Sequence, residues 1–171
     1  MGPARLAATI SAFLILATGR RLTAQSNSDS AYAGVQSRGA AVMGVDQYSS
    51  HHVFEDLPDG GRIVLLRDDV NDSAGAAIIL AHLRRVADSF AAGNFTDPSL
   101  VHAREVPGTT VMTRLHDRIR YVVSERTGGG ELRITTQDSD ARQAIHQFLA
   151  FQRQDHRAPG HEGMEHHHPP S

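Results

Sequence analysis

The sequence predicts an α+β fold, in which two ββα units form a four-stranded antiparallel sheet with two helices on one face. Two pairs of alternating strands are each joined by a glycine-containing turn, at residues 59–61 and 128–130. Each pair is followed by an Asp/Ser cap and by a helix with one apolar stripe. One such unit cannot bury its own apolar face, but two units can share a core.

The first unit extends from His52 to about Ala92. We predict strands over residues 52–57 and 62–67, because glycine in the intervening turn readily adopts the positive φ of tight hairpins. A helix follows the candidate N-caps at residues 71–73. Its apolar residues recur at helical spacing, and Gly93 ends it. The residues of the stripe are Ile79, Leu83, Val86 and Phe90.

The second unit starts at Arg118. Alternation of apolar and polar residues predicts strands on both sides of Gly128–Gly130, and residues 138–140 cap a helix that runs to about His156. The connection between the units, residues 98–112, is too apolar for a free loop. We expect it to lie against the core, with a helical turn over residues 110–116.

The ends of the chain predict export. Residues 1–24 read as a signal peptide, because Arg5 precedes an apolar stretch, Leu6 to Ala17, that is too short to span a bilayer. Cleavage after Ala24 or after Gly19 fits, and the alternative is an uncleaved anchor. Residues 25–42 are predicted to be a disordered linker, residues 43–157 a single domain, and residues 158–171 a disordered His-rich tail. The expected location is the periplasm or the medium, without stable membrane insertion after cleavage.

The amino-acid composition limits the kinds of partner and reaction that the chain can have. The chain has 11 histidines and no cysteine, and its net charge is −2 with neutral histidines. Loss of three arginines with the signal would make the charge about −5, which disfavours nucleic acid as a partner. No disulfide is available, and no nucleophile motif such as GxSxG is present. We therefore expect a binding protein rather than an enzyme, and no protein partner is indicated.

Histidine is the commonest protein metal ligand, and imidazole suits Cu, Zn, Fe and Ni. His51 and His52 are neighbours in a strand, so at most one can face a given site. His82 and His146 lie at the margins of their helix stripes, where a half-buried packing role is the alternative to a ligand role. Met43 and Met112 could add thioether sulfur, which favours Cu(I). The tail histidines, His161 and 166–168, would bind Cu, Ni or Zn weakly.

Several short motifs together resemble a family of small exported bacterial proteins of uncharacterised function, some of which carry the label aspartate carbamoyltransferase. That label does not fit, because the Ser-Thr-Arg-Thr phosphate motif of that much larger enzyme is absent. The resemblance covers residues 43–156 and rests on the following segments: Met43-Gly44-x-Asp46-Gln47, His51-His52-x-Phe54, Asp59-Gly60-Gly61, His82-Leu83, Phe90, Phe95, Val101-His102, Pro107-Gly108, Val111-Met112 and Ala144-Ile145-His146-x-Phe148-Leu149-x-Phe151-Gln152.

What the resemblance implies is a recurring set of His and Met positions, which we take as the candidate metal site: His52, His82, His102, Met112, His146 and His156. We expect a periplasmic metal-binding protein, with copper as the first candidate and zinc as the second. Two alternatives stay open. One is a metal-free interaction module that uses the open face of the sheet, and the other is a small metal-dependent enzyme. Convergence of the histidines in space would favour the metal.

Overall fold

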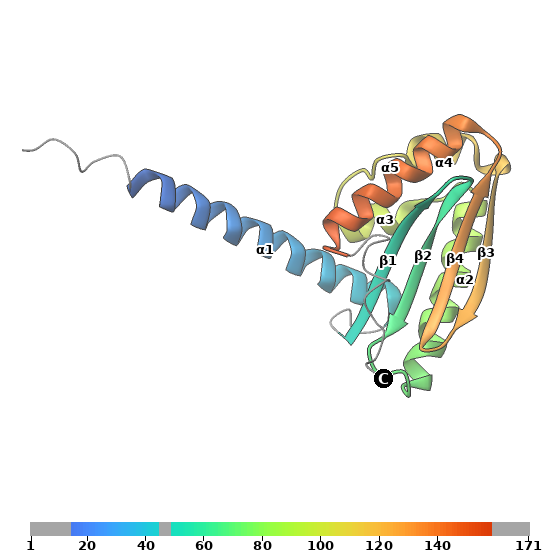
Figure 1. Cartoon of the computed structure of the whole chain (residues 1–171), viewed down its shortest axis with the longest axis horizontal. Coiled ribbons are helices and arrows are strands. Elements are labelled where there is room, and N and C mark those ends of the chain that lie inside the picture. Colours follow the sequence, from blue (N-terminus) through green and yellow to red (C-terminus); the bar gives the residue numbers. More distant parts are fainter. Residues whose placement is uncertain (1–14, 45–48, 159–171) are drawn as a thin grey trace, which may run out of the picture. The chain divides into compact units, whose positions relative to one another are not determined.

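Four strands form one antiparallel sheet in the order β1-β2-β4-β3 (Figure 1). They are β1 (Ser50–Leu57), β2 (Gly60–Arg67), β3 (Ile119–Arg126) and β4 (Gly129–Thr136). The computed structural model describes residues 15–44 and 49–158 of the chain. The predicted sheet is confirmed, with β1–β2 and β3–β4 as hairpins and β2 paired with β4 at the centre.

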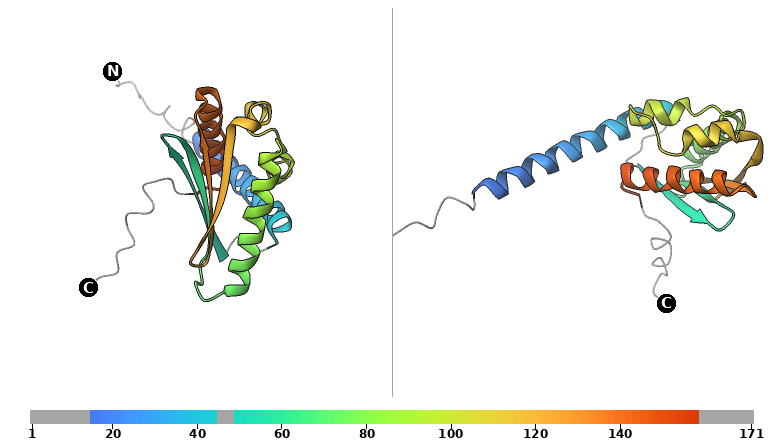
Figure 2. Two further views of the ribbon diagram at one scale, coloured as in Figure 1. Left: turned by 90° about the vertical axis from the view of Figure 1, so that its right-hand side faces the viewer. Right: turned by 90° about the horizontal axis from the view of Figure 1, so that it is seen from above.

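The two long helices of the ββα units pack on the same face of the sheet (Figure 2). They are α2 (Ser73–Ala91) and α5 (Ser139–Asp155). Each begins at an aspartate whose side chain accepts backbone N–H groups that lack partners within the helix. Asp72 accepts from Gly75, and Asp138 accepts from Asp140 and Ala141. The α+β class and the predicted placement of the helices are thus confirmed.

The first hairpin needs glycine at residue 60. Gly60 has a φ of 145°, and a Cβ there would lie 2.2 Å from the carbonyl oxygen of Ile134 on β4. A side chain at this position would therefore separate β2 from β4 at the centre of the sheet. The glycine found in the sequence allows the two strands to pair up to the hairpin.

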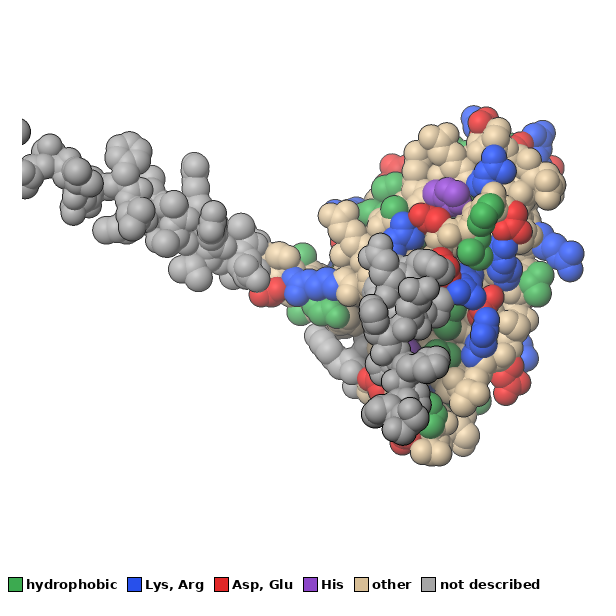
Figure 3. Space-filling view, in the orientation of Figure 1, with side chains coloured by type: hydrophobic (Ala, Val, Ile, Leu, Met, Phe, Trp, Pro, Cys, Tyr) green, Lys and Arg blue, Asp and Glu red, His purple; other side chains and the backbone are tan. Residues whose placement is uncertain are grey.

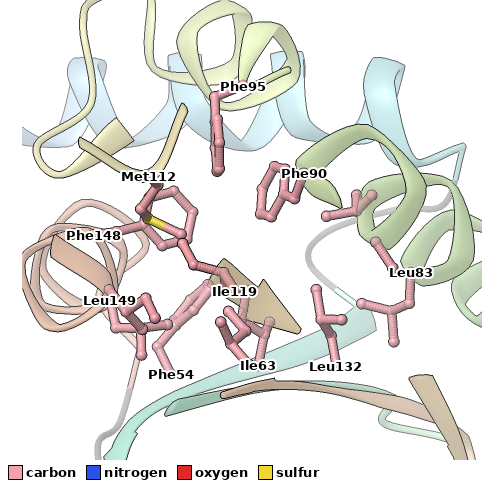
Figure 4. Packing of buried hydrophobic residues seen from close by; sticks show 14 of the residues in the cluster. Phe54, Ile63, Leu83, Phe90, Phe95, Met112, Ile119, Leu132, Phe148 and Leu149 are labelled. Carbon is pink, nitrogen blue, oxygen red and sulfur yellow. The ribbon is translucent and has the colours of Figure 1, made fainter. Parts of the chain in front are cut away.

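The core lies between the sheet and the helices. Phe90 of α2 and Phe148 of α5 meet edge to face, with ring centroids 5.8 Å apart, above Phe54, Ile63 and Leu132 of the sheet (Figure 4). Burial of each aromatic side chain contributes roughly 2 to 3 kcal/mol. The predicted apolar stripes of both helices are buried here.

The connection between the units is helical and covers this core. It contains α3 (Thr96–His102), α4 (Thr109–Arg114) and a 3₁₀ turn, η2 (His116–Arg118). Phe95, Val106 and Met112 are buried against the core, as expected for an apolar connection. The helical turn predicted over residues 110–116 corresponds to α4, whereas α3 was not predicted. Pro98 lies in the first turn of α3, where its missing N–H costs nothing.

The predicted disordered linker over residues 25–42 is wrong. These residues belong to a helix, α1 (Ile15–Met43), which contains six alanines and no proline. The chain divides into two compact units, residues 1–33 and 34–171. In the second unit, Val35, Gln36 and Met43 of α1 are buried. Alanine has the highest helix propensity, and this burial stabilises a segment whose sequence lacks a clear apolar stripe.

The other face of the sheet carries ion pairs as well as apolar side chains such as Val122. Glu55 of β1 accepts from Arg62 of β2 at 2.5 Å, and Glu131 of β4 pairs with both Arg62 and Arg126 of β3. Blue and red side chains accordingly gather over the strands in Figure 3. Each carboxylate lies beside an arginine on a neighbouring strand, so the face is held by alternating charges.

Part of the predicted targeting region and most of the predicted tail, residues 1–14 and 159–171, lie outside the described residues. Among the residues that are described, no helix combines the length and the apolar character needed to cross a membrane.

Candidate functional site

Four of the six predicted site residues line one pocket. The pocket is mainly apolar, has a cavity volume of about 100 Å³, and lies among α1, β1, β2, α2, α3 and α5. The four histidines on its wall come from separate elements: His52 from β1, His82 from α2, His102 from α3 and His156 from the end of α5. This is the convergence that the sequence alone could not establish.

Three of these imidazoles contact one another. The ring of His156 stacks on that of His52, with centroids 5.0 Å apart and planes inclined by 24°. The ring of His102 meets His156 edge to face, at a centroid distance of 5.1 Å. His156 is therefore the central member of the cluster, and we refer to His52, His102 and His156 as the histidine trio.

His156 carries a buried nitrogen without a hydrogen bond. Its Nδ1 has no partner among the described residues. A buried polar atom left in this state costs about 1 to 3 kcal/mol. Most buried polar atoms in folded proteins avoid that cost, so this atom is an exception that lies at the centre of the cluster.

His102 is held on both sides of its ring. Its Nδ1 lies 2.5 Å from a carboxylate oxygen of Asp155, and its Nε2 lies 2.9 Å from the side-chain oxygen of Gln152. A carboxylate only accepts, so Nδ1 carries a proton that it donates to Asp155. An amide oxygen also only accepts, so Nε2 has a lone pair only when the Gln152 amide is turned to present its NH2 group. Arg104 donates to the other oxygen of Asp155 at 2.5 Å. The Nε2 atom therefore has a fixed direction within the cluster.

His82 differs from the trio. Arg85 donates to its Nδ1 at 3.1 Å, and an arginine has no acceptor atom. The lone pair of Nδ1 is thus already used, and in the neutral ring the proton lies on Nε2. His82 lines the pocket, but neither nitrogen offers a lone pair to a ligand in this arrangement.

Burial favours the neutral form of three of the pocket histidines, His52, His82 and His156. It lowers the pKa of His52 to about 3, with further lowering by the neighbouring His156, His82 and His51. Burial also lowers the pKa of His82 to about 4, where Arg85 adds to the effect, and that of His156 to about 4, where His102 adds to it. Neutral imidazole is the form that binds metals.

The other two predicted residues do not line this pocket. Met112 of α4 is fully buried in the core, where its thioether fills space beside Phe148 and Leu149 (Figure 4). The Nε2 of His146 lies 3.1 Å from the carbonyl oxygen of Leu57 and 2.9 Å from that of Gly60. His146 thus donates to the backbone of the β1–β2 hairpin and attaches it to α5.

Replacing His146 with alanine is expected to lower the free energy of unfolding by about 1 to 3 kcal/mol, because two hairpin carbonyls lose their donor. Urea denaturation of the variant and the parent measures this change. His116→Ala is the matched control. His116 is half-buried at the surface, and among the described residues its side chain bonds to the carbonyl of Thr113, so its loss should cost less than about 0.5 kcal/mol. An equal effect of the two substitutions would contradict the role given to His146.

His51 and His52 face different sides of the strand, as the alternation of side chains along a strand predicts. His51 is exposed and bonds to Asp68 at 2.9 Å, whereas His52 faces the pocket. His116 lies outside the pocket, as expected.

The trio is not a preformed metal centre. Among residues 15–44 and 49–158, no three His, Cys, Asp or Glu side chains have the arrangement of a ready metal site. The reason lies in the ring planes, because a metal lies in the plane of each imidazole that binds it, and stacked rings do not point their lone pairs at one place. The distances between the rings and the directions of their lone pairs are therefore two separate properties of this site.

Sequence reasoning missed two residues that shape the pocket. Asp155 is half-buried and bridges His102 to Arg104. Gln152 is 4% exposed beside His102. The spacing of these residues could have indicated that they lie near His156, since residues 152, 155 and 156 share one side of a helix. Met43 of α1, which the sequence offered as a possible sulfur donor, also lines the pocket, although the residues before it had been predicted as a linker.

Comparison with protein-family models, with curated proteins and with solved structures finds no match to this chain.

Proposed function

We propose that the chain is an exported metal-binding protein whose site is the histidine trio, with copper as the first candidate and zinc as the second. The observation that carries the proposal is the buried, unpartnered Nδ1 of His156 between two further imidazoles. A metal ion in the trio would supply that missing partner. Export is inferred from the apolar segment, Leu6 to Ala17.

The spacing of the rings supports this proposal. Imidazoles that bind one ion through nitrogens at about 2.0 to 2.1 Å have ring centroids roughly 5 to 5.5 Å apart. The centroids of His52 and His102 lie 5.0 and 5.1 Å from that of His156. Each outer ring thus lies at the separation from the central ring of His156 that a shared ion requires.

The ring planes can adjust without moving the rings. The centroid of a histidine ring lies almost on the line of the Cβ–Cγ bond, beyond Cγ. Rotation about that bond therefore turns the ring plane and leaves the centroid in place. This torsion is broad in proteins and has no deep staggered wells. Rotation of His52 and His156 would therefore direct their lone pairs toward one point at small cost.

His102 has the surroundings of a metal ligand. A ligating histidine usually donates its second ring N–H to a carboxylate, which fixes the ring and raises its basicity. Asp155 accepts from Nδ1 in this way, and Arg104 holds Asp155. On metal binding, Nε2 would exchange the amide of Gln152 for the ion.

The size of the cavity favours a small occupant. Pockets for organic ligands usually measure about 300 to 1,000 Å³. A cavity of about 100 Å³ instead suits an ion with a few water molecules. This observation supports a metal over an organic cofactor as the ligand.

The test is a metal titration of the full chain and of a tail variant in which His161 and residues 166–168 are replaced by asparagine. We expect the tail variant to retain one equivalent of copper or zinc, measured by calorimetry and by elemental analysis after desalting. At a metal concentration of 100 times Kd, the bound ion adds about 2.7 kcal/mol to stability, which is a rise in Tm of roughly 5 to 10 °C.

The adjacent histidines of β1 provide the control. His52→Asn should remove the tightly bound equivalent, and His51→Asn should leave it unchanged, because only His52 faces the pocket. If the tail variant binds neither ion and its Tm does not move, the proposed function is wrong. Equal loss in the two β1 variants would place the site outside the trio.

A further inference from the structure

The wall of the pocket contains a soft donor that the trio does not include. Met43 of α1 is 4% exposed and lines the same cavity as His52 and His102. Its helix is fixed there by two hydrogen bonds to backbone carbonyls. Arg38 donates to Val101 at 2.7 Å, and Arg85 donates to Val42 at 3.0 Å.

The position of this methionine differs from that of Met112. Met112 is 0% exposed, belongs to the core cluster and does not line the pocket. Both sulfur atoms are buried, but only that of Met43 belongs to a residue on the wall beside the imidazoles. The two methionines therefore form an internal pair, one beside the site and one remote from it.

The side chains on the wall of the pocket favour a soft monovalent ion over a divalent one. A thioether is a soft ligand that selects Cu(I), whereas Zn(II) takes thiolate, imidazole or carboxylate. The desolvation cost of an ion rises with the square of its charge, so an apolar cavity favours a monovalent ion over a divalent one. Among the described residues of this wall, Asp97 is the one carboxylate, and Asp155 behind His102 is paired with Arg104, which leaves little negative charge to balance a divalent ion.

We infer that Met43 supplies a thioether ligand to the ion bound by the trio, and that the site is selective for Cu(I). This inference rests on the proposed function and adds to it the oxidation state of the ion and a fourth ligand. The cluster would then be a site with imidazole nitrogens from three elements and sulfur from a fourth, α1.

The experiment uses the full chain with its tail donors removed, because Met164 and the tail histidines would otherwise contribute to the signal. The parent for the test carries His161→Asn, Met164→Leu and asparagine at residues 166–168. It is loaded with Cu(I) without oxygen, and the X-ray absorption spectrum at the copper edge is recorded. We expect one sulfur scatterer together with nitrogen scatterers.

Met43→Leu should remove the sulfur contribution and weaken Cu(I) binding by about tenfold or more in a competition with a chromophoric chelator. Zn(II) affinity should change by less than about threefold, because zinc does not use the thioether. Met112→Leu is the matched control and should leave both the spectrum and the Cu(I) affinity unchanged. Leucine nearly conserves the volume of methionine, so packing is preserved in each variant.

The outcomes separate the two proposals. Copper bound by nitrogen alone in the parent would overturn the role of Met43 and leave the histidine site standing. A parent that binds zinc but no copper would overturn the Cu(I) inference and leave the histidine site standing, and a parent that binds neither ion would overturn both. The spectrum of the parent does not depend on any Met43 variant, so the test holds even if Met43→Leu fails to fold.

Discussion

Acidification of the metal-free protein from pH 7 to pH 5 is expected to lower its free energy of unfolding by about 4 to 6 kcal/mol. The cause is the burial of neutral histidines in the pocket, where the pKa of His52 is about 3 and those of His82 and His156 are about 4. A loss of this size is a large part of the stability of a typical domain.

The sign of this change in the free energy of unfolding follows from proton binding by the folded and the unfolded chain. Below the ordinary histidine pKa of about 6.5, the unfolded chain takes up protons that the folded pocket does not accept. The folded state is thus fully stable above pH 6.5 and loses stability as the pH falls toward 4. Each of the three histidines contributes about 2 kcal/mol at pH 5. The carboxylates with shifted pKa values do not obscure this window, because the pKa values of Asp59, Asp72 and Asp138 are lowered by hydrogen bonds and those groups act below pH 4.

Urea denaturation at a series of pH values measures the effect. The slope of stability against pH between 5 and 6 should approach three protons, or about 4 kcal/mol per pH unit. His156→Phe should reduce that slope by about one proton, and His116→Asn, a control at the surface, should not change it. Stability that stays constant from pH 7 to pH 5 would show that the pocket accepts protons and is not the apolar environment described above.

Replacing Asp155 with asparagine is expected to weaken metal binding by about 10- to 100-fold, because the carboxylate that orients His102 is lost. The asparagine amide keeps the size of the side chain and can still accept from Nδ1, but it removes the charge that raises the basicity of the ring. His156→Phe, which deletes the central ligand, should reduce affinity by about 100-fold or more. Competition titrations with a chelator of known affinity measure both changes.

Arg104 provides the matched comparison for Asp155. It donates to the second oxygen of that carboxylate and its side chain is 56% exposed. Arg104→Gln should therefore alter affinity by less than about threefold, because a solvated ion pair contributes little. If Asp155→Asn and Arg104→Gln have the same effect, Asp155 acts through surface charge and not by orienting His102.

Strand and helix elements of the domain could be predicted from the sequence because each has a local signal. The turns at Gly60 and Gly128, the caps at Asp72 and Asp138, and the stripes of α2 and α5 all depend on neighbouring residues. Helix α1 could not be predicted in this way, since its burial depends on contacts with Val101 and Arg85, about 45 to 60 positions further along the chain.

The candidate site shows the same division between local and distant signals. The histidines could be nominated by type, but only the packing of separate elements decides that His156 lies beside His52 and that His146 binds a hairpin. Met112 was placed in the site because of its residue type, but it lies in the core. Residue type alone could not distinguish these roles, because the core also uses methionine as a space-filling residue. The metal-free use of the open sheet face stays a prediction, and that face carries ion pairs together with Val122, which is 41% exposed.

The contribution of α1 to the pocket sets a limit on how the chain can be shortened. Gly39, Val42 and Met43 form part of the wall, so the smallest fragment that retains the pocket begins at or before Gly34, where the second compact unit starts. Removal of a signal peptide at Ala24 would leave this wall intact. A fragment that starts at Met43, the domain boundary suggested by the sequence, would keep the sheet and its core but would leave the histidine trio open to water.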